Sequence, residues 1–495
     1  MDKNRKLICL VLTLILGFSA KIYAQNAFPR VEPEAKALDY YRLGAQTGYS
    51  WTTLAEISLW ASGDVSLTGM DKIKTAVTAL NAVIDPAFSE KEKAEFILNY
   101  MHKNLLKNYS PYQTRVDTLL SNGRFNCVSS AVFYVILCKS AGLNTSGVMT
   151  KDHAFAMVHI NGQDFDVETT NAYGFDPGNR KEFHDTNGKT AGFAYVPQRN
   201  YRDRQTISQI ELVSLILNNR ISDLEKSNNF SAAVPLAVDR AVLLLGASFT
   251  NTAGTRTSGF LFADPGKTMI DTFLNYGTSL LKGNREEDGI RWAVLASSIY
   301  PDPDRWQLFL FAAVNNRITR FIKEKKTQDA RNFLEAQKTN ISEANYAQLD
   351  MLVIDADLSN RASNFKTTDE GEEIITAIVQ ARDGKKLTEK RASELLTFTI
   401  QKIAASLCAA PGRDWRTAIS YLENALSKYG ANRELDQSLR AYRSNLASDY
   451  HNSFAAEWNK KNYAAAERVL NEGLAEFPDN RQLLNDKQII DKQVR

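Results

Sequence analysis

Residues 123–142 have the sequence Gly-Arg-Phe-Asn-Cys-Val-Ser-Ser-Ala-Val-Phe-Tyr-Val-Ile-Leu-Cys-Lys-Ser-Ala-Gly. The apolar run from Val128 to Cys138 predicts a buried helix. Cys127 lies in the first turn of this helix, and Gly142 supplies the left-handed residue that a helix end often needs. We expect the rest of the first domain to be organised around this helix and its cysteine.

A second stretch, residues 152–170, predicts a β-hairpin that follows the helix. Residues 154–160 have the composition of a strand, rich in apolar and β-branched side chains. The dipeptide Asn161-Gly162 is the strongest short signal for a two-residue hairpin turn. The turn therefore fixes which residues of the two strands lie opposite each other.

The predicted register brings a histidine close to an acidic side chain. If the loop has two residues, paired positions sum to 323, so Phe155 lies opposite Glu168. Because side chains alternate between the faces of a strand, His153 shares a face with Glu168 and with Asp166. Glu168 is diagonal to His153, at roughly 7–8 Å between backbones, which a Glu side chain can bridge. Asp166 lies two residues further away, so we expect it to be out of reach.

A cysteine, a histidine and an acid in this arrangement form a candidate catalytic site. A helix N-terminus has unpaired N–H groups and partial positive charge, both of which favour a thiolate and can stabilise an oxyanion. We assign Cys127 as the nucleophile, His153 as the base and Glu168 as the acid that orients the imidazole.

Two other interpretations of the same residues stay open. A cysteine in an apolar helix is usually an inert core residue, and Cys138, in the middle of the helix, fits that description. A zinc site could be built from Cys127, His153 and Glu168, but no fourth ligand stands at metal spacing. We therefore expect neither a metal nor another cofactor.

The order of these residues resembles that of the transglutaminase-like thiol enzymes, which share it with papain-like peptidases. The resemblance covers roughly residues 89–201, and three segments carry it: Asn126-Cys127, Asp152-His153-Ala154-Phe155 and Asp166-Val167-Glu168-Thr169-Thr170. It implies an α+β transglutaminase-like (papain-like) domain and acyl chemistry at amide bonds, by hydrolysis, deamidation or transamidation. The chain departs from the family in having Glu168 where Asp is usual, and Phe155 where Trp is frequent.

The resemblance also suggests further site residues. An upstream Gln side chain binds the oxyanion in papain-like enzymes, and Gln113 lies fourteen residues before Cys127. Gln113 is therefore a candidate oxyanion residue, with an ordinary polar loop residue as the favoured alternative, and Val128 at the start of the helix is a second candidate. Candidates for the walls of the cleft are Asn126, Phe155 and Tyr173.

The N-terminus predicts export. A basic segment precedes the apolar run from Leu7 to Ala20, and Ile22-Tyr23-Ala24 is a suitable cleavage sequence, so residues 1–24 are a predicted signal peptide. The run is too short to span a bilayer, which needs about 20 residues, so we expect no membrane span after cleavage. The expected location is periplasmic or extracellular.

Charge and motifs exclude several classes of function. Residues 1–24 carry a net charge of +3, as does the whole chain, so the mature chain is close to neutral. This balance, without a basic stripe interleaved with aromatic residues, gives no reason to expect binding to nucleic acid. Cys127, Cys138 and Cys408 do not form a disulfide framework. The serine hydrolase motif Gly-x-Ser-x-Gly and the zinc motif His-Glu-x-x-His are absent from the sequence.

From about Thr206 to the end, the composition predicts helices that repeat. Residues 414–426 match residues 462–474 at an offset of 48, with Ala418 and Ala466 among the identities. The small, bulky, small and Pro spacing resembles tetratricopeptide repeats, which implies stacked helix pairs that bind a protein or peptide.

The predicted organisation leads to two hypotheses of different class. The first is an exported cysteine peptidase, amidase or acyltransferase whose helical repeats bind a protein or peptide substrate. The second is a catalytically inactive transglutaminase-like domain that serves as a protein-binding or assembly module. The sequence leaves the oligomeric state open. The predicted segments are a signal peptide (1–24), an N-terminal helical extension (25–85), the transglutaminase-like domain (86–205) and the repeat domain (206–495).

Overall fold

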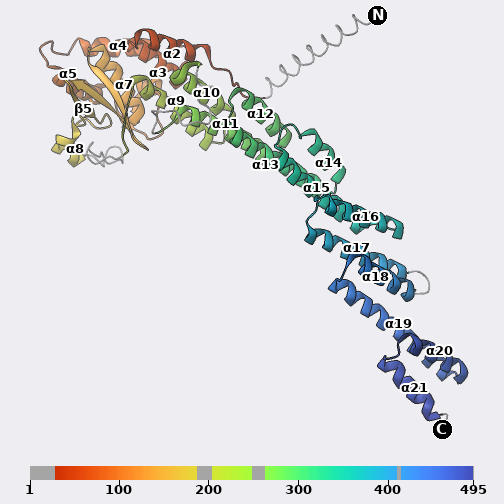
Figure 1. Ribbon diagram of the computed structural model, residues 1–495. Coiled ribbons are helices and arrows are strands. Elements are labelled where there is room, and N and C mark those ends of the chain that lie inside the picture. The colour runs from red at the N-terminus through yellow and green to blue at the C-terminus, as the bar shows by residue number, and fades with distance from the viewer. Residues whose placement is uncertain (1–27, 187–202, 248–261, 410–413, 494–495) are drawn as a thin grey trace, which may run out of the picture. The chain divides into compact units, whose positions relative to one another are not determined.

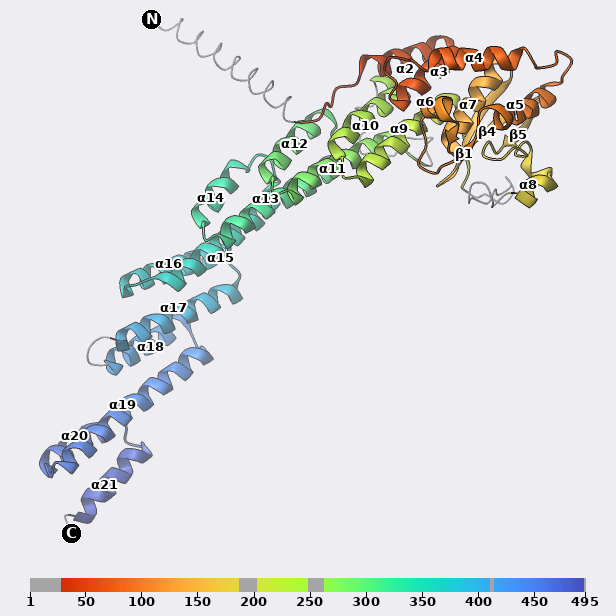
Figure 2. The same ribbon diagram turned by 180° about the vertical axis from the view of Figure 1, so that it is seen from behind.

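The computed structural model describes residues 28–186, 203–247, 262–409 and 414–493. The chain is mostly helical with small sheets, and it divides into two compact units after Ala313 (Figures 1 and 2). The predicted signal peptide lies outside the described residues. Within those residues, no helix combines the length and the apolar character that crossing a membrane requires.

Helices make up most of the first unit. The predicted N-terminal extension contains three of them. The bounds are α2 (Ala35–Thr47), α3 (Trp51–Ser62), α4 (Met70–Asn81), α5 (Glu90–Asn104), α6 (Val116–Asn122), α7 (Cys127–Ser140), α8 (Lys181–Thr186), α9 (Gln209–Lys226), α10 (Phe230–Leu245), α11 (Pro265–Lys282) and α12 (Glu286–Ile299), while α13 (Pro303–Lys323) extends beyond the division.

Helix α7 is the predicted helix with Cys127 at its start, and it is buried along its length. Every residue from Cys127 to Cys138 is buried. The helix contacts α3, α5, α6 and α9 as well as strands β3 (Asn144–Met149) and β4 (Ala154–Ile160), which explains why its sequence is apolar on all faces. Figure 1 shows it between these helices and the sheet.

The main sheet of the first unit is antiparallel, with the strand order β5-β4-β3-β6. The predicted turn between β4 and β5 is present, since Asn161 and Gly162 have φ values of 51° and 78°, the left-handed values of this hairpin turn. Met157 pairs with Asp166, and Ala156 with Val167. The predicted register is therefore confirmed. The bounds are β3 (Asn144–Met149), β4 (Ala154–Ile160), β5 (Gln163–Val167) and β6 (Gln205–Ile207).

A short parallel pair of strands leads into α7. Strand β1 (Asn108–Tyr109) pairs with β2 (Arg124–Phe125), and Tyr109 lies opposite Phe125. Because β2 ends two residues before Cys127, this pairing holds Tyr109 beside the start of α7. The aromatic rings of Tyr109 and Phe125 pack edge to face, with centroids 5.8 Å apart.

The first unit continues well beyond residue 206, where the sequence interpretation placed the start of the repeat domain. Helix α9 packs on α3, α7 and β3, and α10 packs on α2 and α9. The structure therefore adds α9 to α12 to the unit that holds Cys127.

The second unit is entirely helical among its described residues, and successive helices pack on one another. The sequence match at an offset of 48 corresponds to two similar helix pairs, α18–α19 and α20–α21. Ala418 and Ala466 are both buried. Asn432 caps α19 and Asn480 caps α21, each side chain accepting two backbone N–H groups. The bounds are α14 (Thr327–Ala336), α15 (Glu343–Asn364), α16 (Thr368–Asp383), α17 (Glu389–Ala409), α18 (Trp415–Tyr429), α19 (Arg433–Asn459), α20 (Tyr463–Glu476) and α21 (Arg481–Gln493).

Candidate active site

Cys127 is the first residue of α7, and a reciprocal cap fixes its position. The Asn126 side chain accepts the backbone N–H of Ser129 at 3.0 Å, while the Ser129 hydroxyl accepts the backbone N–H of Asn126 at 3.0 Å. Asn126 also donates its side-chain amide to the carbonyl of Pro111. Cys127 as a whole residue is 9% exposed, at the start of a helix whose residues are buried from Cys127 to Cys138.

His153 and Glu168 meet as the hairpin register predicts. The Nε2–H of His153 donates to Oε2 of Glu168 at 2.6 Å, and the two side chains are only 7% and 4% exposed. The other oxygen of Glu168 accepts the backbone N–H of Thr170 at 3.1 Å and its hydroxyl at 2.6 Å. Both carboxylate oxygens are thus held, and Glu168 in turn fixes the plane of the imidazole.

The three predicted catalytic residues are electrostatically coupled. Burial by itself would lower the pKa of His153, but the charge of Glu168 and a hydrogen bond with Cys127 outweigh it and raise that pKa well above 6.5. Burial would raise the pKa of Glu168, yet the nearby imidazole and Thr170 bring it below 4.5. Nε2 of His153 faces Glu168, and Nδ1 is buried on the other side of the ring. The structure therefore places Cys127, His153 and Glu168 close enough to interact electrostatically.

Several positioning residues escaped sequence reasoning because their partners are distant in the chain. The hydroxyls of Ser130 on α7 and Thr169 after β5 share a hydrogen bond of 2.8 Å, which joins the helix to the hairpin. His102 on α5 donates to the carbonyl of Thr169 at 3.0 Å. A Cβ at Gly174 would lie 1.9 Å from the carbonyl oxygen of Glu168, so only glycine fits there.

Asp166, the other acid on the same face, belongs to a separate ion pair. Arg204 binds both of its carboxylate oxygens, at 2.7 and 2.8 Å. Phe155, predicted in the cleft wall, is instead a core residue that packs with Val148 and Met157. Its ring centroid lies 6.0 Å from that of His153, and the guanidinium of Arg204 lies over the Phe155 ring at 5.3 Å.

The oxyanion role predicted for Gln113 is not supported by its contacts. Its side-chain amide donates to the backbone carbonyls of Arg115 and Arg124, at 2.7 and 2.9 Å, and its oxygen accepts the N–H of Arg115. Gln113 thus fixes the loop before α6. The backbone N–H groups of Val128 and Cys127 donate to no other described group, so they remain candidates for binding an oxyanion.

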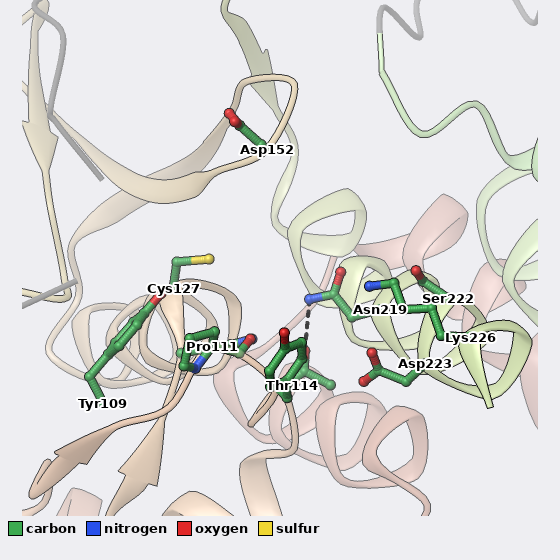
Figure 3. Close-up of a pocket in the computed structure, with 11 residues that line it drawn as sticks. Tyr109, Pro111, Thr114, Cys127, Asp152, Asn219, Ser222, Asp223 and Lys226 are labelled. Carbon is green, nitrogen blue, oxygen red and sulfur yellow. Dashed lines mark hydrogen bonds between the residues drawn. The ribbon is translucent and has the colours of Figure 1, made fainter. Parts of the chain in front are cut away.

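Tyr109 is a site residue that the sequence interpretation missed. Figure 3 shows its ring with the hydroxyl end directed toward Cys127. Burial, followed by the charges of Cys127 and Glu168, raises the pKa of this phenol, so it stays a hydrogen-bond donor. Tyr173, by contrast, is 45% exposed and is not among the residues that line the pocket at Cys127. The aromatic residues of that pocket are Tyr109 and Tyr112.

An open pocket lies beside the thiol (Figure 3). Cys127 and Asn126 line it on one side. Helix α9 lines it on the other side, although the sequence interpretation assigned that helix to the repeats. The residues that α9 contributes are Asn219, Ser222, Asp223 and Lys226.

The arrangement places a thiol, an imidazole and a carboxylate beside an open pocket. Across the described residues, no group of three or more His, Cys, Asp or Glu side chains is placed to hold a metal ion. Cys127, Cys138 and Cys408 are free thiols. Burial raises the pKa of Cys138, which fits its expected role as an inert core residue.

Comparisons with known proteins add little to this geometry. No protein-family model matches the chain, and no curated protein matches it in sequence. Among solved structures, the chain is similar to a crystal structure of menin, described as revealing the binding site for Mixed Lineage Leukemia (MLL) protein. The identity is 12% and the TM-score 0.32, over 84% of this chain and 92% of that chain. At this TM-score the likeness says nothing about fold or function.

Proposed function

We propose that the protein is a cysteine-dependent hydrolase or acyltransferase of the transglutaminase-like type, acting on amide bonds. The observation that carries the proposal is the buried 2.6 Å hydrogen bond between Glu168 and His153, in series with Cys127 at a capped helix start. A structural cysteine has no need of an oriented imidazole and a pocket beside it.

The reaction proceeds in two steps. His153 takes the proton of the Cys127 thiol, and the thiolate attacks the carbonyl carbon of the amide. The imidazolium then gives this proton to the leaving amine as the carbon–nitrogen bond breaks, which leaves a thioester on Cys127. In the second step His153 takes a proton from water or from an acceptor amine, which attacks the thioester and releases the acid or the new amide.

The oxyanion formed in each step needs hydrogen-bond donors. The backbone N–H groups of Cys127 and Val128 point out of the first turn of α7, where the helix dipole adds positive potential. The phenol of Tyr109 is a third donor on the same side of the pocket. In this proposal Tyr109 takes the place that the sequence interpretation gave to Gln113.

The transglutaminase-like fold is part of the proposal. Its support is the order of the elements. Helix α7, which begins with Cys127, precedes the antiparallel hairpin of β4 and β5. His153 comes directly before β4, and Glu168 comes directly after β5. Glu168 in place of the usual Asp is longer by one methylene group, and its two bonds to Thr170 hold the longer side chain in place.

The alkylation rate of Cys127 against pH tests the catalytic proposal. Iodoacetamide should label Cys127 quickly at pH 6, and His153→Ala should remove this fast reaction. Cys138 in the same chain is the internal control, because its burial should keep it unlabelled in the folded protein. If Cys127 reacts only above about pH 8, as an ordinary thiol does, and does so equally in both proteins, the catalytic proposal is refuted.

A second role, binding a protein or peptide, is favoured by a pocket in the helical unit. It lies within residues 382–435, where Thr397, Ile400 and Asn432 are among its lining residues. We propose that the repeat-like helices bind a peptide segment there. A substitution of Ile400 is unsuitable as a test because Ile400 is buried in the core. Ser393→Arg, at the pocket lining, should weaken peptide capture, with Ser438→Arg outside it as the control.

Export completes the proposal. Its support is the basic and apolar N-terminal sequence that ends at Ala24. N-terminal sequencing of the protein recovered from outside the cytoplasm should begin at Gln25. A mature chain that retains Met1 would contradict export through a cleaved signal.

A further inference from the structure

Four polar side chains of α9 form one wall of the pocket beside Cys127. Asn219, Ser222, Asp223 and Lys226 stand at positions i, i+3, i+4 and i+7, so they lie on a single face of the helix. Figure 3 shows this row across the pocket from the thiol. Asn219 is held by its donation to the hydroxyl of Thr114 at 3.2 Å, which leaves Asp223 and Lys226 as the charged groups of this wall.

The remaining lining adds one acid and an exposed aromatic ring. Asp152 lies above the thiol in the view of Figure 3, in the turn before His153, and it lines the same pocket. Tyr112 is 75% exposed although it is a large aromatic residue that also lines the pocket. Together with Asp223 and Lys226, the lining holds two carboxylates against one ammonium group, a net charge of −1.

We propose that this pocket selects acyl substrates that carry a cationic group close to the attacked carbonyl. The inference rests on the proposed function, since it names the substrate class of the same site. A cation in the pocket would lie near the carboxylates of Asp152 and Asp223 and against the ring face of Tyr112, and both interactions favour positive charge. The cationic group is part of the acyl substrate and is not the amine that attacks the thioester. A permanently charged group, which cannot react as an amine, should therefore be recognised equally well.

The surroundings of Asp223 strengthen its effect on a ligand. Partial burial raises the pKa of its carboxyl group, and the charge of Lys226 acts in the opposite direction. A partly desolvated carboxylate interacts more strongly with a nearby charge than one in free solution, because the local dielectric constant is lower. Asp223 is therefore the residue on which selectivity should depend most.

Charged thiol reagents test the selectivity without knowledge of the natural substrate. We would compare methanethiosulfonates with a trimethylammonium, a neutral methyl and a sulfonate group on the full chain, and follow Cys127 by peptide mass mapping. The cationic reagent should react faster than the anionic one. Asp223→Asn should lower the ratio of the two rates roughly tenfold, and Lys226→Met should raise it by a similar factor.

Glu225→Gln is the matched control, because it removes the same charge from the same helix outside the pocket lining. It should change the ratio by less than about twofold, as expected for a screened charge. A native ratio near or below one, or equal effects of Asp223→Asn and Glu225→Gln, would overturn the selectivity. If the neutral reagent still reacts fast at pH 6 and depends on His153, the proposed function survives that result. Slow labelling that does not depend on His153 overturns both.

Discussion

Replacing Glu168 by Gln should remove most of the reactivity of Cys127 at pH 6. The substitution keeps the size of the side chain and leaves an amide oxygen to accept the Nε2–H of His153. It removes the negative charge that now lies 2.6 Å from the ring and that raises the pKa of the imidazole. The protonated imidazole of His153 then loses the charge that stabilises it most, and the thiolate proposed to pair with it is destabilised as well.

The size of the effect follows from the geometry of this pair. A buried hydrogen bond to a charged group is worth about 1.5–3 kcal/mol. Both side chains are nearly inaccessible to water, so solvent screening does not reduce this value much. At about 1.4 kcal/mol per factor of ten, this loss should lower the alkylation rate of Cys127 at pH 6 about 10- to 100-fold.

The assay is the rate of Cys127 alkylation by iodoacetamide between pH 5 and pH 9.5. We expect the rates of Glu168→Gln and the native protein to differ most at the acidic end and to converge where free thiols ionise. Asp164→Asn is the control, because Asp164 pairs with His159 at the exposed end of the same hairpin. An unchanged rate at pH 6 in Glu168→Gln would refute the role assigned to this acid.

Three further predictions concern stability. The lowered pKa of Glu168 contributes stability that is present above pH 4.5 and is lost as the pH falls. The raised pKa of His153 contributes stability that is present below pH 6.5 and is lost as the pH rises through the pKa of the folded state. The difference in free energy of unfolding between native protein and Glu168→Gln, measured by urea denaturation, should thus be largest between these pH values. Gly174→Ala should lower the free energy of unfolding by more than about 2 kcal/mol, because its Cβ would overlap a backbone oxygen. Gly178→Ala is the control, since its Cβ would meet nothing within 4 Å, and it should lower the free energy of unfolding by less than about 0.5 kcal/mol in the same assay. Asn432→Ala should destabilise the start of α19 by about 1 kcal/mol, visible as faster amide exchange in its first turn, and unchanged exchange there would contradict the capping role.

The parts of the site that the sequence predicted are those fixed by local rules. The turn Asn161-Gly162 admits one hairpin geometry, and the alternation of strand side chains then brings His153 and Glu168 together. The apolar run after Cys127 similarly requires a buried helix. These inferences need only neighbours in sequence, and the structure agrees with them.

The parts that the sequence interpretation missed depend on contacts between distant segments. Whether Gln113 faces the thiol or the backbone is decided by the carbonyl of Arg124, eleven residues away, and the pattern of side chains contains no signal for this. An amphipathic helix such as α9 packs equally well on a sheet or on another helix, so its sequence did not reveal that it belongs to the first unit. Tyr109 could have been found only by recognising that two two-residue strands pair in parallel.

The hydrogen bond between His153 and Glu168 has a consequence for the order in which the site forms. These residues are 15 positions apart, whereas the contact of Ser130 with Thr169, which joins α7 to the hairpin, spans 39 positions. Hairpins form within about 1–10 μs, and contacts between more distant residues form later. During synthesis Cys127 therefore emerges before His153 and Glu168. Under the proposed function, the site can become reactive only once the folded hairpin docks against the start of α7.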